Sequence, residues 1–135
     1  MPEPVHVVDA SVLVRYLLRD NPEMHARAAR VIDSDQPLGI TAVAVLETAY
    51  VLQRVYGVPR AAIVDALVGL VSRRNFVGVG IEIDEIAAKL LLCRPSGTVS
   101  FGDALLAATA QSAGIGSAYT FDQKLGRAGL SAVIP

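Results

Sequence analysis

The sequence has few of the features that mark secreted or membrane proteins. Cys93 is the single cysteine among 135 residues, which excludes a disulfide framework and a zinc site built from cysteines. No apolar run reaches about 18 residues, so we expect no membrane-spanning segment. The N-terminal residues lack the basic stretch of a secretory signal. These absences together predict a cytoplasmic protein.

An excess of charge of one sign is also lacking. The net charge of −1 excludes a protein that binds nucleic acid nonspecifically through bulk positive charge. Ten of the twelve basic residues are arginine, which suits phosphate contacts, although genome composition is the simpler explanation. The hydrophobic fraction of 53% supports a packed core. With no repeat or linker, we expect one domain over residues 1–135.

Strand-like and helix-like segments alternate along the chain. The strands are expected at Val5–Asp9, Leu38–Ile40, Phe76–Ile81, Ser117–Thr120 and Ala132–Ile134. The helices are expected at Ser11–Arg19, Pro22–Asp33, Ala42–Tyr56, Arg60–Arg73, Glu85–Cys93 and Ala104–Ser112, with a turn at Pro95-Ser96-Gly97 and a short helix after Asp122. The alternation predicts the α/β class, as a three-layer α/β/α sandwich with a central, mainly parallel sheet.

Polar residues at the expected helix starts support these boundaries. Asn21, Thr41, Asp84 and Ser100 each stand just before a helical segment, where a side-chain oxygen can accept a hydrogen bond from a free backbone N–H. Pro22 follows Asn21 and fits the first helical position.

Four of the thirteen acidic residues stand in unusual contexts. Asp9 and Asp122 follow expected strands at their carboxyl ends, Glu47 lies within an apolar helix, and Asp103 opens an alanine-rich helix. Each also has a structural explanation. The three aspartates can cap or stabilise a helix start, and Glu47 can extend to solvent from a half-buried helix.

The four acids together favour a metal site. Asp9 and Asp122 are expected at one edge of one sheet, and the helix of Asp103 returns from that edge. Two carboxylates about 4 Å apart repel by about 4 kcal/mol at an effective dielectric constant near 20, so such a cluster requires a cation. Oxygen ligands without a histidine pair indicate Mg²⁺ or Mn²⁺, which suits phosphoryl chemistry. His6 and His25 are expected to have structural roles.

Four segments, in this order, resemble the signature of PIN-domain ribonucleases, and in particular the VapC-type toxins of toxin–antitoxin pairs. They are Val-Val-Asp9-Ala-Ser11-Val-Leu, Leu46-Glu47-Thr-Ala-Tyr, Phe101-Gly-Asp103-Ala-Leu-Leu and Tyr119-Thr120-Phe121-Asp122. The resemblance implies that Asp9 and Asp103 bind the divalent ion, that Asp122 contributes to the same site, and that Glu47 contributes or orients a water. Ser11 and Thr120 match supporting positions.

The resemblance further implies metal-assisted hydrolysis of RNA, a homodimer, and neutralisation by a VapB-like, DNA-binding antitoxin. The sequence departs from many relatives at Ser100, where they carry a further acid, so a fifth ligand and tight binding of a second metal are in doubt. The helices at Ser11–Arg19, Ala42–Tyr56 and Arg60–Arg73 have wide apolar faces. Most of these residues are expected in the core, and the excess is expected to form a groove for the antitoxin.

Two alternatives remain open. One is a PIN-like module that binds RNA or protein without cutting it. The other is a different α/β phosphoryl-transfer enzyme. A haloacid-dehalogenase-type phosphatase requires a second aspartate where this chain has Ser11, and the glycine-rich motif of P-loop enzymes is absent.

Overall fold

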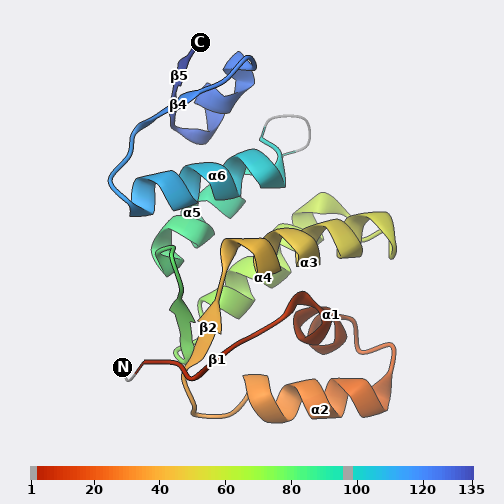
Figure 1. Ribbon diagram of the computed structural model, residues 1–135. Helices are drawn as coiled ribbons and strands as arrows, with labels where there is room; N and C mark the ends of the chain where they lie inside the picture. Colours follow the sequence, from red (N-terminus) through yellow and green to blue (C-terminus); the bar gives the residue numbers. More distant parts are fainter. Residues whose placement is uncertain (1–2, 96–98) are drawn as a thin grey trace.

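The computed structural model describes residues 3–95 and 99–135 (Figure 1). The strands are β1 (His6–Val7), β2 (Leu38–Ile40), β3 (Phe76–Gly78), β4 (Ser117–Tyr119) and β5 (Ser131–Val133). The helices are α1 (Ala10–Leu18), α2 (Pro22–Ile32), α3 (Ala42–Arg54), α4 (Arg60–Val71), α5 (Ile83–Leu92), α6 (Phe101–Ser112) and the 3₁₀-helix η1 (Gln123–Ala128). Helices combined with a parallel sheet confirm the expected α/β class. The turn expected at Pro95-Ser96-Gly97 extends into residues outside the described ranges.

Strand β2 is the centre of a parallel three-stranded sheet of order β1-β2-β3. Helices α1 and α2 connect β1 to β2, and α3 and α4 connect β2 to β3, because parallel neighbours require a long crossover. Gly39 in β2 is buried, and a Cβ atom there would lie 2.9 Å from Val79 Cγ2 and 3.2 Å from Val7 Cγ1. The glycine therefore lets these two valines close over the central strand.

Strand β3 is shorter than the sequence predicts. It ends at Gly78, whereas the apolar run to Ile81 predicts three further strand residues. The chain turns back at Gly80, whose φ is 70°, and the carbonyl of Ile81 occupies the place where a Cβ of residue 78 would stand. The two glycines thus shape a tight turn, since only glycine tolerates both the close approach and the positive φ.

Side-chain caps start most of the helices where the sequence predicts. Asn21, Thr41 and Ser100 each accept a hydrogen bond from the backbone N–H three residues later, at 3.1, 3.2 and 3.0 Å. The expected cap at Asp84 is wrong, because α5 begins at Ile83 and Asp84 lies in its first turn. The capping position is Glu82, whose own N–H donates to Ser112 Oγ at 2.8 Å.

The core is one apolar cluster that extends from the first sheet through the helices to the C-terminal segment. Helix α3 packs against α1, α4 and α6, and α5 packs against α4 and α6. No helix within residues 3–95 and 99–135 has the length and apolar character needed to cross a membrane. The largest fully buried side chains include Leu13, Ile32, Leu38, Ile40, Ile63, Leu67, Ile86, Leu90 and Phe101.

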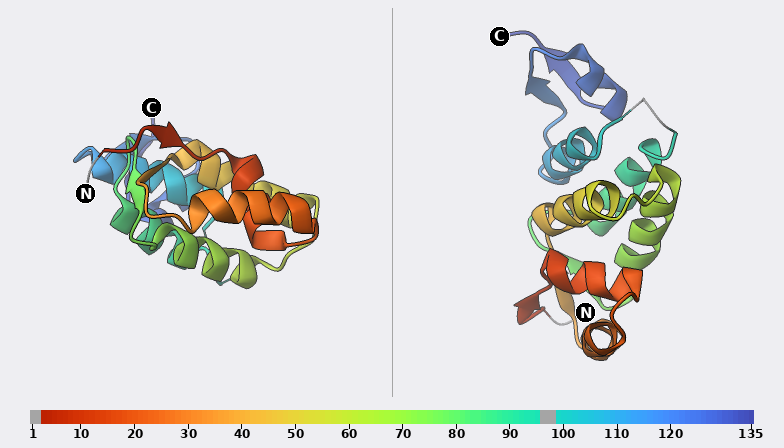
Figure 2. Two further views of the ribbon diagram at one scale, coloured as in Figure 1. Left: turned by 90° about the horizontal axis from the view of Figure 1, so that it is seen from below. Right: turned by 90° about the vertical axis from the view of Figure 1, so that its right-hand side faces the viewer.

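The expectation that the strand at residues 117–120 joins the sheet of the first strand is wrong for this structure. Strand β4 pairs in parallel with β5 in a separate two-stranded sheet. Leu125, Ala128 and Leu130 are buried in the core, and η1 packs on α6, so this C-terminal unit is held beside α6. In Figure 1 and in the right-hand view of Figure 2 it lies far from β1, with α3 between them.

Candidate active-site carboxylates

Asp9 lies between β1 and α1 and is the N-cap of that helix. Its Oδ2 accepts hydrogen bonds from the Ser11 N–H at 3.1 Å and from Ser11 Oγ at 2.6 Å. These bonds lower the pKa of Asp9, the hydroxyl bond most, so the carboxylate is ionised at neutral pH. Both of these bonds use the same oxygen, Oδ2. Asp9 therefore caps a helix and also presents an exposed, charged oxygen.

Asp122 repeats this arrangement in the C-terminal unit. It is the exposed N-cap of η1, and its Oδ1 accepts a hydrogen bond from the Lys124 N–H at 2.9 Å. The Thr120 hydroxyl accepts a bond from the Asp122 N–H at 2.9 Å and donates one to the Asp122 carbonyl at 3.2 Å. Thr120 thus fixes the backbone that carries Asp122. Its supporting role in a functional site stays a prediction.

Asp103 is half-buried in the first turn of α6, where its N–H donates to Ser100 Oγ. Arg60, whose guanidinium lies over the Phe101 ring at the start of α6, donates hydrogen bonds to the carbonyls of Cys93 and Val99, at 3.3 and 3.0 Å. Burial raises the pKa of the Cys93 thiol to about 11; the Arg60 charge opposes this increase and the Asp103 charge adds to it. The thiol is therefore protonated at neutral pH and unreactive.

Glu47 is an exposed residue of α3. Its neighbour Thr48 is fully buried and donates a hydrogen bond to the Ala44 carbonyl at 2.7 Å. The buried Thr48 and the exposed Glu47 show that α3 turns one face to the core and the other to solvent. The position of Glu47 thus matches its structural explanation, and its catalytic role stays a prediction.

The structure does not bring the four acids together. Within residues 3–95 and 99–135, no three Asp, Glu, His or Cys side chains form a group that could hold a metal ion. Asp9 belongs to the end with β1, and Asp122 belongs to the opposite end (Figures 1 and 2). A divalent ion does not fit the acids in this arrangement. Their roles as ligands stay a prediction.

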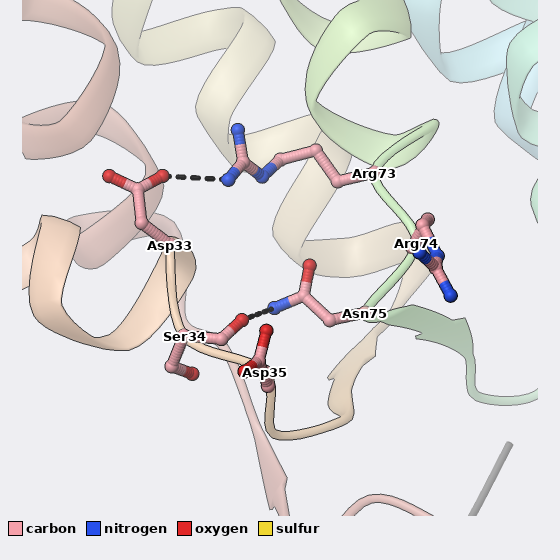
Figure 3. Close-up of a pocket in the computed structure, with 6 residues that line it drawn as sticks. All are labelled: Asp33, Ser34, Asp35, Arg73, Arg74 and Asn75. Atoms are coloured by element: carbon pink, nitrogen blue, oxygen red, sulfur yellow. Dashed lines mark hydrogen bonds and ion pairs between the residues drawn. The ribbon is translucent and has the colours of Figure 1, made fainter.

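A cavity of about 530 Å³ lies where α2 meets the connection between α4 and β3 (Figure 3). Arg73 Nη2 lies 2.7 Å from Asp33 Oδ1, and the Tyr16 hydroxyl donates to the same oxygen at 2.7 Å, which raises the pKa of Tyr16. The lining holds two arginines and two aspartates, so it does not favour a polyanion. We interpret it as a structural junction. The residues that line it are Asp33, Ser34, Asp35, Arg73, Arg74 and Asn75.

Sequence reasoning assigned no role to Asn75, which is buried at this junction. Its Nδ2 donates to the carbonyls of Ile32, Ser34 and Gln36, at 3.1, 3.1 and 3.3 Å. One side chain thus ties the end of α2 and the following loop to the start of β3. An asparagine just before an apolar strand was the available signal, but such a residue is as common in an ordinary turn.

Comparison with known families places the chain in one of them. A family model described as PIN domain matches residues 6–130. The matched range includes Asp9, Glu47, Asp103 and Asp122. No curated protein matches the chain.

Proposed function

Because the chain belongs to the PIN-domain family, whose members are generally nucleases, we propose that it is a Mg²⁺-dependent endoribonuclease and the toxin of a toxin–antitoxin pair. Mn²⁺ is the alternative ion. The proposed site of action is the cytoplasm, and the proposed substrate is cellular RNA. The proposal extends the family's general activity to one substrate, one cofactor and one biological role.

The observation that carries this proposal is the state of Asp9. It follows β1 and is exposed, and two hydrogen bonds from Ser11 to its Oδ2 lower its pKa, so that it is ionised. The four acids supply only hard oxygen donors, which Mg²⁺ prefers. We assign Asp9, Asp103 and Asp122 as the metal ligands and Glu47 as a fourth catalytic residue. Because no three acidic, histidine or cysteine side chains group together within residues 3–95 and 99–135, this assignment is supported by the family match and by the residue types.

The separation of the acids favours one other function, a PIN-like module that binds RNA or protein without cutting it. Removing the metal with a chelator distinguishes the nuclease from the silent binding module. We expect purified protein to cut a pool of structured RNAs in Mg²⁺, to stop in excess EDTA, and to resume when Mg²⁺ is restored, as measured by gel electrophoresis of labelled RNA. A metal-independent contaminating ribonuclease would keep cutting in EDTA. RNA binding that EDTA leaves unchanged, with no cleavage under any condition, would support the silent module instead.

We also propose an antitoxin segment as partner. An apolar groove of about 370 Å³ between α1 and α2 is lined by Val12, Met24, Ala28 and Val31, with arginines at its rim. The groove lies partly on α2, whereas the sequence pointed to α1, α3 and α4. The apolar floor and basic rim fit an amphipathic helix with acidic flanking residues. The rim arginines are Arg27 and Arg30.

The groove is tested by placing a charge in it. Val31 is 37% exposed, so Val31→Glu is expected to leave folding intact and to weaken capture of the coexpressed antitoxin at least about 10-fold. Val43→Glu is the matched control, because Val43 is 66% exposed on α3 and is not among the groove residues. Pull-down with the tagged antitoxin measures how much of each variant is captured. Equal capture of the two variants would show that the partner binds elsewhere.

A further inference from the structure

Arg60 is the first residue of α4, and its side chain reaches both the end of α5 and the start of α6. Its Nη1 donates hydrogen bonds to the carbonyl oxygens of Cys93 and Val99, at 3.3 and 3.0 Å. Its guanidinium also lies over the ring of Phe101, 4.9 Å from the ring centroid. One side chain from α4 thus connects the residue that ends α5 to the residues at which α6 begins.

The two carbonyls that Arg60 contacts both need a donor. Cys93 is the C-cap of α5, where the last carbonyls have no partner within the helix. A cation at this position also suits the negative end of the helix dipole. Because Cys93 and Val99 are buried, carbonyl oxygens left without a donor there would cost free energy. The two bonds of Arg60 therefore stabilise the junction of the two helices.

The segment that Arg60 holds leads directly into the turn that carries Asp103. Val99 precedes Ser100, the N-cap of α6, and Ser100 Oγ accepts a hydrogen bond from the Asp103 N–H at 3.0 Å. The charges of Arg60 and Asp103 act on the Cys93 thiol with opposite effects on its pKa, so both lie near that thiol. Asp103 stands about one helical turn after Val99, so a shift at residue 99 displaces its carboxylate as well.

Apolar contacts do not by themselves fix the direction of this turn. Val99 and Phe101 are buried in the core on either side of Ser100. Burial of apolar surface is favourable but has no preferred direction, whereas a hydrogen bond weakens when its angle changes. Arg60 adds two such directional contacts to the segment that the core already holds, and so restrains its orientation.

We propose that Arg60 is a positioning residue for RNA cleavage, because it joins the end of α5 to the start of α6 and so fixes the turn that carries Asp103. The inference rests on the proposed function for the role of Asp103 in cleavage. A reacting group that is displaced by about 1 Å can lose about 100-fold in rate. A restraint one turn away from Asp103 therefore affects cleavage without any contact between Arg60 and the RNA.

Amide hydrogen exchange measured by NMR tests the restraint without reference to activity. The Ala104 N–H donates to the Ser100 carbonyl at 3.0 Å and reports on the first turn of α6, whereas the Ala108 N–H reports on the middle of that helix. Arg60→Met keeps a long side chain but removes both hydrogen bonds. It is expected to raise the exchange rate of Ala104 by at least about 10-fold relative to that of Ala108. A general loss of stability would raise both rates together.

Arg94→Met is the matched control for this experiment. Arg94 donates to both carboxylate oxygens of Asp65 on α4, at 2.9 and 3.0 Å, so this variant also removes an arginine with two bonds near the end of α5. Both side chains are exposed, and the bonds lead to α4 rather than to α6. The ratio of the two exchange rates is therefore expected to stay within about twofold of the wild-type ratio. A change in this ratio for Arg60→Met no larger than that for Arg94→Met would overturn the inference.

The kinetics of RNA cleavage distinguish positioning from a purely structural role. Because Arg60 acts through Asp103 and not on the RNA, Arg60→Met is expected to lower kcat by about 10- to 100-fold and to leave KM within about twofold. Arg60→Lys keeps a cation that can donate to one of the two carbonyls, so its kcat is expected to exceed that of Arg60→Met by at least about fivefold.

The two measurements separate the inference from the proposed function. Faster exchange at Ala104 with unchanged kcat would overturn the positioning role of Arg60 and keep the proposed function. A wild-type protein that cuts no RNA would overturn the proposed function, and with it the role in cleavage. The ratio of exchange rates would then still decide whether Arg60 fixes the turn of Asp103.

Discussion

Replacing Asp9 by asparagine is expected to leave the protein folded and to abolish its cleavage of RNA. As an N-cap, Asp9 accepts a backbone hydrogen bond, and asparagine serves about as well in that role. As the proposed metal ligand it would supply a negative charge, which asparagine lacks. A bound ion contributes several kcal/mol to such reactions, so we expect a loss of at least about 100-fold in kcat/KM. The two roles are therefore separated by a single substitution.

The measurement compares RNA cleavage rates with the free energy of unfolding obtained from urea titration. The expected change in stability for Asp9→Asn is within about 0.5 kcal/mol. Asp84→Asn is the matched control, because Asp84 is an exposed acid in the first turn of α5 and has no role in the proposed site. It is expected to keep full activity. Unchanged cleavage by Asp9→Asn protein would reduce Asp9 to a helix cap.

Replacing Asn75 by aspartate is expected to produce a large loss of stability. The Asn75 amide donates to three carbonyl oxygens from a buried position. An aspartate has the same shape but presents a negative oxygen where the amide nitrogen stood, so three carbonyls lose their donor and face a charge. Leaving buried partners unsatisfied and burying an unpaired charge together cost about 3–5 kcal/mol.

The matched control is Asn21→Asp, which makes the same chemical change at a site with the opposite requirement. Asn21 uses its oxygen, which accepts a hydrogen bond from the Met24 N–H at 3.1 Å. Aspartate can accept that bond too, and its charge suits the positive end of α2, so stability should stay equal or rise by up to about 1 kcal/mol. Thermal and urea unfolding measure both variants. Similar losses at the two positions would mean that the donor role of Asn75 does not matter.

Local features of the fold were predictable because their causes lie within a few residues. The helix starts at Asn21, Thr41 and Ser100 depend on a hydrogen bond that spans three positions, and each lies where the sequence indicates. Strand β2 has the expected bounds. The error at Asp84 arises where this local signal is missing, because α5 begins at Ile83 and its N-cap Glu82 makes no side-chain cap hydrogen bond.

Longer-range features were predicted less well. The strand was expected to continue to Ile81, whereas it ends at Gly78, where the Ile81 carbonyl approaches too closely for a Cβ atom. That contact depends on the path of the chain after it leaves the sheet. The spacing of apolar residues along the sequence carries no information about that path. Asn75 was missed for a similar reason, because its three partners lie about forty residues earlier in the chain.

The sequence by itself determined the α/β class, most of the helix caps, the family and the four acids with their order along the chain. Only the tertiary structure decided which strands share a sheet, and therefore which acids are neighbours. The reason is that a strand's backbone groups can pair with any free edge, so the choice depends on packing far away in the sequence. Here β4 pairs with β5 and η1 packs on α6, so Asp122 belongs to a different sheet from the one that Asp9 follows.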